Sequence, residues 1–181
     1  MNLIPRLDNY MPESLSLRRL PSALQKCLLL SLACCALAAQ AQVPADNPDW
    51  QETEAPAPPP FNPRQLVSVD MPPYVSMKFG VDPATLAVTP DGIVRYVMVA
   101  VSPSGSMNAF FEGIRCATGE VKSYARANAQ GVWTQVKKPE WRRLNDKHPS
   151  KHALALAQQG VCEGNATAGS AAQIFRNLKS K

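Results

Sequence analysis

The sequence predicts an α+β fold, mainly β, in which an antiparallel meander of about five strands carries two or three short helices packed on one face. Three features predict it: a repeated hairpin loop, a matching alternation of apolar side chains, and a change of pattern after Val136. Between Leu86 and Val136, strand-forming runs are joined by three-residue loops that end in glycine, which suits the left-handed position of the commonest three-residue hairpin. The loops are Pro90-Asp91-Gly92, Pro103-Ser104-Gly105, Ala117-Thr118-Gly119 and Ala129-Gln130-Gly131.

Each loop also predicts which residues face one another across a hairpin. The second loop places Val97 opposite Phe111, the third places Ala125 opposite Phe111, and the fourth places Ala127 opposite Trp133. These apolar side chains share one face, which is therefore the predicted core face. Small residues on that face leave room for a helix to approach, and they are Gly113, Ser123 and Ala125.

Two short strands are expected before the meander, at Leu66–Asp70 and Tyr74–Val81. In the second, apolar residues alternate with polar or small ones, as in a strand with one buried face. The two strands either pair with the edge of the meander or cover one of its faces, and the sequence leaves both arrangements open.

Helical patterns follow Val136. Pro139 is expected to start a helical turn, Pro149-Ser150 a second helix that stops at Gly160, and Ser170 to cap a final amphipathic helix. The last helix has three apolar residues close together: Ile174, Phe175 and Leu178. Residues 164–181 are predicted to form a small-residue linker followed by this short helix.

Residues 1–41 resemble a secretory signal peptide. Arg18, Arg19 and Lys26 form a positive region, an apolar run follows, and Ala39-Gln40-Ala41 has the small-x-small form of a cleavage site. The apolar run is too short to span a bilayer, so no transmembrane segment is expected after signal removal. Lipidation at Cys34 and translation from Met11 are open alternatives. We therefore expect an exported protein of the bacterial periplasm or outer envelope.

Signal removal leaves two cysteines, Cys116 and Cys162. An even pair in an oxidising compartment predicts a disulfide, with two buried thiols as the alternative.

Residues 42–63 form a leader rich in proline and acidic residues, ahead of a single domain predicted at residues 64–163. The leader has four acidic residues and no basic one, so the domain that follows is basic. A flexible or a wrapped conformation suits this composition. Trp50 and Phe61 are its only large apolar side chains, and we expect them to pin the leader to its own domain.

Two groups of residues are candidate binding sites. A candidate ligand face lies opposite the core face and consists of Tyr96, Glu112, Tyr124 and Arg126. It is either a packed row, in which Glu112 accepts hydrogen bonds from the two tyrosines under the leader, or a surface that binds a ligand. A candidate anion patch consists of Lys137, Lys138, Arg142 and Arg143. It is either a solvated basic surface or a site for an envelope protein, a lipid head group or a wall polymer.

The familiar signatures of catalysis are missing from the sequence. No G-x-S-x-G elbow, phosphate-binding glycine loop or dinucleotide fingerprint occurs, so we assign no catalytic residue and no cofactor. His148 and His152 lack a matching cysteine or carboxylate cluster, and we assign no metal site. Export makes nucleic acid an unsuitable partner.

The order of several short motifs resembles the cryptic neisserial protein-like (CNP-like) family of proteobacterial envelope proteins over residues 48–163. The motifs are Trp50-Gln51-Glu52, Asp91 to Tyr96, Asn108, Glu112 to Cys116, Lys122 with Tyr124-Ala125, Gly131-Val132-Trp133 and the late cysteine. The resemblance implies an exported protein with one small domain and implies no mechanism. Among these residues, Arg95 and Arg115 fall at one end of the meander, where we expect them to grip the leader or the helical region.

Two functions follow as hypotheses. The first is a non-enzymatic envelope protein that binds another envelope component. The second is an enzyme of unknown type that uses the face of Tyr96, Glu112, Tyr124 and Arg126. A buried Glu112 with a perturbed pKa in a pocket would favour the enzyme, and a flat solvated face would favour binding.

Overall fold

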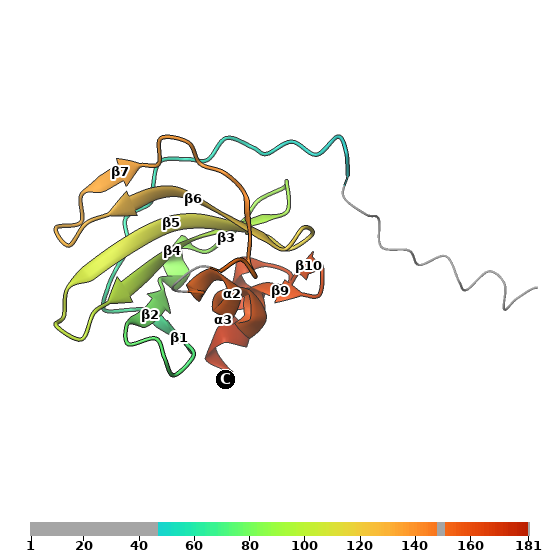
Figure 1. The fold of residues 1–181 in the computed structure, drawn as a ribbon. Helices are drawn as coiled ribbons and strands as arrows, with labels where there is room; N and C mark the ends of the chain where they lie inside the picture. Colours follow the sequence, from blue (N-terminus) through green and yellow to red (C-terminus); the bar gives the residue numbers. More distant parts are fainter. Residues whose placement is uncertain (1–46, 148–150, 181) are drawn as a thin grey trace, which may run out of the picture. The chain divides into compact units, whose positions relative to one another are not determined.

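An antiparallel sheet centred on three long strands organises the protein (Figure 1). The computed structural model describes residues 47–147 and 151–180. The long strands are β4 (Ile93–Val101), β5 (Met107–Arg115) and β6 (Glu120–Ala127), flanked in the chain by the short β3 (Ala87–Val88) and β7 (Trp133–Gln135). These five strands form the predicted meander, and the four loop glycines have φ values of 80°, 83°, 65° and 76°. The α+β, mainly β fold is confirmed.

The two strands before the meander extend the same sheet. β1 (Val67–Val69) pairs with β2 (Lys78–Val81), and β2 pairs with the second half of β4. A 3-10 turn, η2 (Pro83–Thr85), then leads to β3, which pairs with the first half of β4. The sequence left open whether these two strands pair with the edge of the meander or cover one of its faces. In the structure they pair with its edge.

The predicted register is correct along most of the meander. Val97 lies opposite Phe111, Phe111 opposite Ala125, and Ala127 opposite Trp133. The agreement arises because each hairpin loop fixes the pairing of the residues beside it.

A β-bulge between β5 and β6 changes the rest of that register. Phe111 faces Ala125, but the next residue, Glu112, faces Ser123, so Tyr124 is an extra residue on β6. Beyond the bulge the side chains of β6 exchange faces. The prediction that Tyr124 lies beside Glu112 is therefore wrong, and so is the prediction that Ser123 lies on the core face, because Ser123 shares the face of Glu112.

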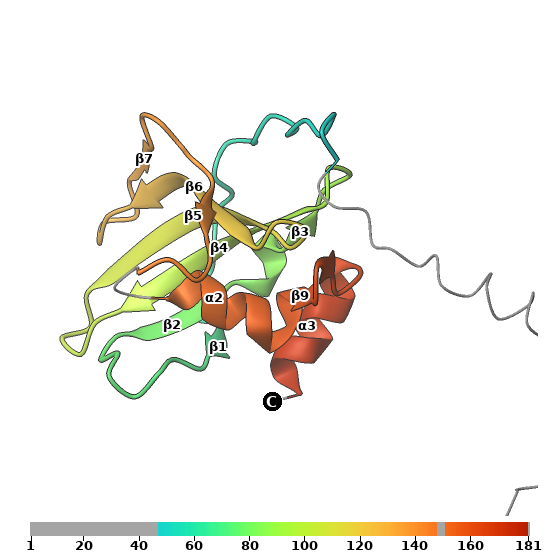
Figure 2. The ribbon, with the colours of Figure 1, turned by 45° about the vertical axis from the view of Figure 1, so that its right-hand side comes forward.

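The helices pack on the face that the sequence assigned to a ligand. α2 (His152–Leu156), the π-helical turn η3 (Ala157–Val161) and α3 (Ala171–Lys179) lie together on one side of the sheet (Figure 2). Their core includes Tyr96, Met98, Ile114, Leu156 and Ile174. One helical layer was expected, but its predicted face was wrong.

The leader covers the other face. Ala55 and Phe61 pack there against a cluster that contains Val97, Val99 and Phe111. All residues from Ile93 to Ala100 are buried, so apolar alternation along β4 does not distinguish the two faces.

Two details after β7 differ from the expected pattern, and a third is not tested. The predicted turn at Pro139 is replaced by an extended segment with the short strand β8 (Arg142–Arg143), which pairs with β6. Just before this segment, Val136 N–H donates to Tyr124 O on β6 at 2.8 Å, so the backbone on both sides of Pro139 is hydrogen-bonded to β6. A small hairpin of β9 (Cys162–Glu163) and β10 (Ala166–Thr167) begins just before the predicted linker and has its second strand inside it. The predicted helix start at Pro149-Ser150 lies outside the described residues.

Two of the predicted terminal features are present. Gly160 interrupts the helical backbone with a φ of 152°, and the Ser170 side chain caps α3 by accepting a hydrogen bond from Gln173 N–H. Cys116 and Cys162 form the expected disulfide, with a Cα–Cα distance of 5.7 Å, which joins the end of β5 to β9. Within residues 47–147 and 151–180, no helix is long and apolar enough to cross a membrane. The predicted signal peptide lies outside this part.

Candidate functional site

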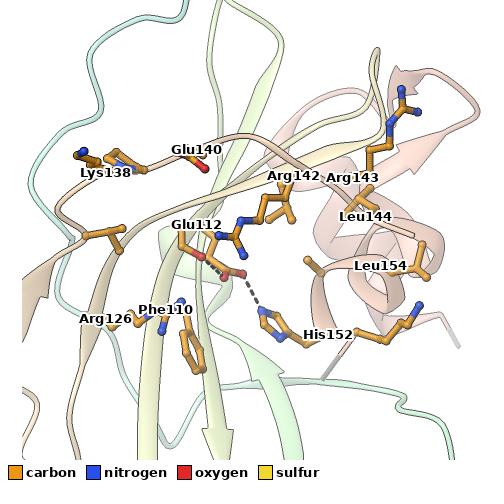
Figure 3. A pocket seen from close by; sticks show the side chains of 16 residues that line it. Phe110, Glu112, Arg126, Lys138, Glu140, Arg142, Arg143, Leu144, His152 and Leu154 are labelled. Atoms are coloured by element: carbon orange, nitrogen blue, oxygen red, sulfur yellow. Dashed lines mark hydrogen bonds and ion pairs between the residues drawn. The ribbon is translucent and has the colours of Figure 1, made fainter. Parts of the chain in front are cut away.

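A pocket of about 320 Å³ lies between the sheet, the segment after β7 and α2 (Figure 3). We call it the basic pocket, because five cationic side chains line it: Arg126, Lys138, Arg142, Arg143 and Lys151. Apolar lining comes from Phe110, Val121, Val136, Leu144 and Leu154. Two acids also line it, Glu112 and Glu140.

Glu112 lies at the base of the pocket with only 3% of its surface exposed. Its carboxylate accepts hydrogen bonds from Tyr96 Oη at 3.0 Å and from Ser123 Oγ at 2.8 Å, and it contacts His152 Nε2 at 2.8 Å. The packing interpretation correctly predicted the bond from Tyr96. The bulge puts Ser123 in the position predicted for Tyr124.

His152 is clamped between two aromatic rings. It stacks on Phe79 at 5.2 Å and on Phe110 at 5.4 Å, measured between ring centroids. Its side chain is 12% exposed and forms an ion pair with Glu112 when protonated. No sequence pattern predicted the contact between Glu112 and His152, since the two residues are 40 positions apart and belong to different elements. The described residues contain no group of three potential metal ligands from His, Cys, Asp and Glu.

The pKa of Glu112 reflects opposing effects. Burial alone would raise it, but the charge of His152 and the hydrogen bonds from His152, Ser123 and Tyr96 bring it below its ordinary value of 4.5. Burial, then the charge of Glu112, raises the pKa of Tyr96 well above its ordinary range. Glu112 is therefore a carboxylate at neutral pH, and Tyr96 is a neutral donor to it.

The cations around the pocket come from separate parts of the chain. Arg126 projects from β6 with its guanidinium carbon 6.0 Å from the centre of the Phe110 ring. On β8, Arg142 pairs with Val121 and Arg143 with Glu120, so the two arginines alternate in direction. Figure 3 shows Arg142 pointing toward Glu112 and Arg143 pointing away. Lys138, Arg142 and Arg143 form no ion pair with any residue in the described ranges.

The structure thus joins parts of the two groups that the sequence kept separate. Glu112 and Arg126 of the candidate ligand face meet Lys138, Arg142 and Arg143 of the candidate anion patch. Tyr96 does not line the pocket but donates a hydrogen bond to Glu112, which does. Lys137 is exposed and does not line the pocket either.

Tyr124 serves the leader on the opposite face. Glu52 of the leader accepts from Tyr124 Oη at 2.9 Å, from Lys122 Nζ at 2.7 Å and from Trp141 Nε1 at 3.1 Å. Burial raises the pKa of Tyr124 above its usual range, so it remains a donor. Glu52 therefore forms its ion pair and its hydrogen bonds with residues of its own domain, and these contacts hold the leader on the sheet.

Other contacts hold the leader as the sequence led us to expect. The Arg115 guanidinium lies 3.6 Å from the centre of the Trp50 ring, and Arg95 Nη2 donates to Thr53 O at 2.6 Å. Phe61 packs edge-on against Trp133 at 5.9 Å. The two arginines and the two leader aromatics therefore hold a wrapped leader.

Comparison with known proteins supports the resemblance seen in the sequence. The family model of the CNP1-like family matches residues 45–179. Neither the curated proteins nor the solved structures give a significant match. The matched range includes most of the leader, the sheet, the basic pocket and α3, and it extends past both ends of residues 48–163. The chain therefore belongs to the CNP1-like family.

Proposed function

We propose that this protein is an exported, non-enzymatic component of the bacterial periplasm or outer envelope that binds a negatively charged envelope component in the basic pocket. Export is supported by the charge and apolar pattern of residues 1–41. A disulfide between Cys116 and Cys162 is compatible with an oxidising compartment.

The observation that carries the proposal is the unbalanced positive charge at the pocket. Five cationic side chains line it against two acids, and one of those acids, Glu112, is already engaged with His152. Cations gathered in a concave site attract an anion more strongly than the same charges spread over a flat surface. The apolar residues between them provide contact area for the ligand.

Co-sedimentation with vesicles and with isolated cell-wall sacculi tests this function. We expect binding to phosphatidylglycerol vesicles or sacculi, no binding to neutral phosphatidylcholine vesicles, and loss of binding when Arg126, Lys138, Arg142 and Arg143 are replaced by glutamine. A matched control removes the same charge from four exposed residues away from the pocket, Arg64, Lys78, Arg176 and Lys179. Equal binding by the two variants would contradict the proposal.

An enzyme of unknown type is the second candidate, because Glu112 is buried, has a shifted pKa and lines a pocket. Against this candidate, both oxygens of Glu112 already accept hydrogen bonds, and His152 directs Nε2 at the carboxylate. A general base needs its basic atom within reach of the substrate. The pair is better arranged to shape the pocket floor than to move a proton.

Mass spectrometry separates the two functions. Envelope extract is incubated with the wild-type protein and with the His152→Phe variant, and the masses of its components are compared. New products that the variant fails to make would support the enzyme. Components that bind but return with unchanged mass would support the binding protein.

A further inference from the structure

We infer that the ligand of the basic pocket is a small amphiphile that carries a phosphomonoester head and an apolar body. This inference rests on the proposed function and goes further by naming the chemical class of the ligand. Its grounds are the charge of the pocket, the direction of its arginines, its volume and its apolar walls.

The charge of the lining suits a dianion. Counted without His152 and without the outward-pointing Arg143, the four remaining cationic side chains exceed Glu112 and Glu140 by two positive charges. A phosphomonoester carries about −1.5 to −2 charges at neutral pH, whereas a carboxylate carries one. The phosphate therefore neutralises more of the surplus within one small site.

Two arginines are placed to hold such a head group. Arg142 points into the pocket from β8 (Figure 3). Arg126, on β6, lies beside the ring of Phe110, on β5. Guanidinium groups bind phosphate oxygens through paired, charge-assisted hydrogen bonds. The carboxylate of Glu112 lies near these arginines but already has three partners, Tyr96, Ser123 and His152. It therefore competes with a phosphate for the arginines less than an unpartnered carboxylate would.

The walls of the pocket require an apolar body. Phe110, Val121, Leu144 and Leu154 line the space around the cations. A bare phosphate ion would leave these side chains in contact with water, whereas a short alkyl or aromatic group would cover them. A volume of about 320 Å³ lies at the lower end for small-molecule sites, so the pocket encloses a small molecule or one end of a larger one.

Calorimetric titration with four soluble probes tests the inference. Octyl phosphate has both features, inorganic phosphate lacks the apolar body, octyl glucoside lacks the charge, and octanoate has a single charge. We expect octyl phosphate to bind at least tenfold more tightly than each of the other three. Equal affinity for inorganic phosphate, octyl glucoside or octanoate would overturn the inference.

Single substitutions locate the binding site. Arg142→Gln should weaken octyl phosphate binding about tenfold or more, the size expected for one hydrogen bond between charged groups. Arg143→Gln removes the same charge one residue away, where the side chain points outward, and should weaken binding much less. Leu154→Ser should reduce the advantage of octyl phosphate over inorganic phosphate, and Lys78→Gln serves as the distant control. Equal losses from Arg142→Gln and Arg143→Gln would overturn the assigned geometry.

Vesicles that contain phosphatidic acid separate the possible sources of the ligand and the two levels of the proposal. Binding to octyl phosphate together with these vesicles supports the inference with a lipid as the source. Binding to octyl phosphate alone supports it with a soluble phosphate ester as the source. Pocket-dependent binding to phosphatidylglycerol vesicles or sacculi, without preference for octyl phosphate, overturns the inference and leaves the proposed function standing. Absence of binding to every probe overturns both.

Discussion

The buried pair of Glu112 and His152 should be energetically coupled, and a double-mutant cycle can measure the coupling. His152→Phe keeps an aromatic ring between Phe79 and Phe110 but removes the ion-pair partner of Glu112. Glu112→Gln keeps the shape of the side chain and removes its charge. The double variant removes both charges and leaves the stacked rings in place.

The structure sets the expected magnitudes. The side chains of Glu112 and His152 are 4% and 12% exposed, and breaking a buried pair costs about 3–5 kcal/mol because it leaves an unpaired charge. Tyr96 and Ser123 still donate to the carboxylate, so we expect His152→Phe to cost about 3 kcal/mol, at the lower end. Glu112→Gln should cost about 1–2 kcal/mol. The loss of unfolding free energy in the double variant should be about 2 kcal/mol smaller than the sum of the losses in the two single variants.

Urea unfolding at several pH values measures these free energies. The lowered pKa of Glu112 means that the stability contributed by its ionisation is present above pH 4.5 and is lost as the pH falls through the folded-state pKa. The deficit of His152→Phe should therefore shrink on acidification, as Glu112 takes up a proton. Losses that add to within about 0.5 kcal/mol, with no dependence on pH, would refute the coupling.

Three further outcomes test other parts of the fold. Replacing Cys116 and Cys162 by alanine should lower the free energy of unfolding by about 4 kcal/mol, from the entropy of a loop closed over a separation of 46 residues; two reactive thiols in the denatured, unreduced wild-type protein would contradict the disulfide. Glu52→Gln should cost about 1–2 kcal/mol and speed protease cleavage of the leader, and unchanged cleavage would contradict the clamp around Glu52. Gly113→Ala should cost about 1–3 kcal/mol in thermal unfolding, because the added methyl carbon would lie 2.7 Å from Ile93 Cγ2, and a neutral result would contradict the tight packing there.

Local sequence signals predicted the parts of the fold that local chemistry controls. The loop glycines at positions 92, 105, 119 and 131 all have the expected positive φ, and the pairing beside each loop follows from the loop itself. Ser170 caps α3 for the same reason, since a cap needs only the first residues of its own helix.

Long-range partners were less accessible to sequence reasoning. Glu112 meets His152 through the packing of α2 on β5, and neither residue carries a local mark of that contact. The lining of the basic pocket also depends on β8, where the sequence suggested a helical turn. Residues of the two candidate sites were therefore found by their chemistry, while their meeting point required the structure.

The bulge at Tyr124 shows how one residue can decide both faces of the sheet. With an unbroken register, Tyr124 would stand beside Glu112, and its ring would occupy space that now belongs to the basic pocket. The extra residue places the small Ser123 there instead, which satisfies Glu112 and lines the pocket. The same shift carries Tyr124 to the opposite face, where it binds Glu52 of the leader. A single change in register thus provides an open pocket on one face and an anchor for the leader on the other.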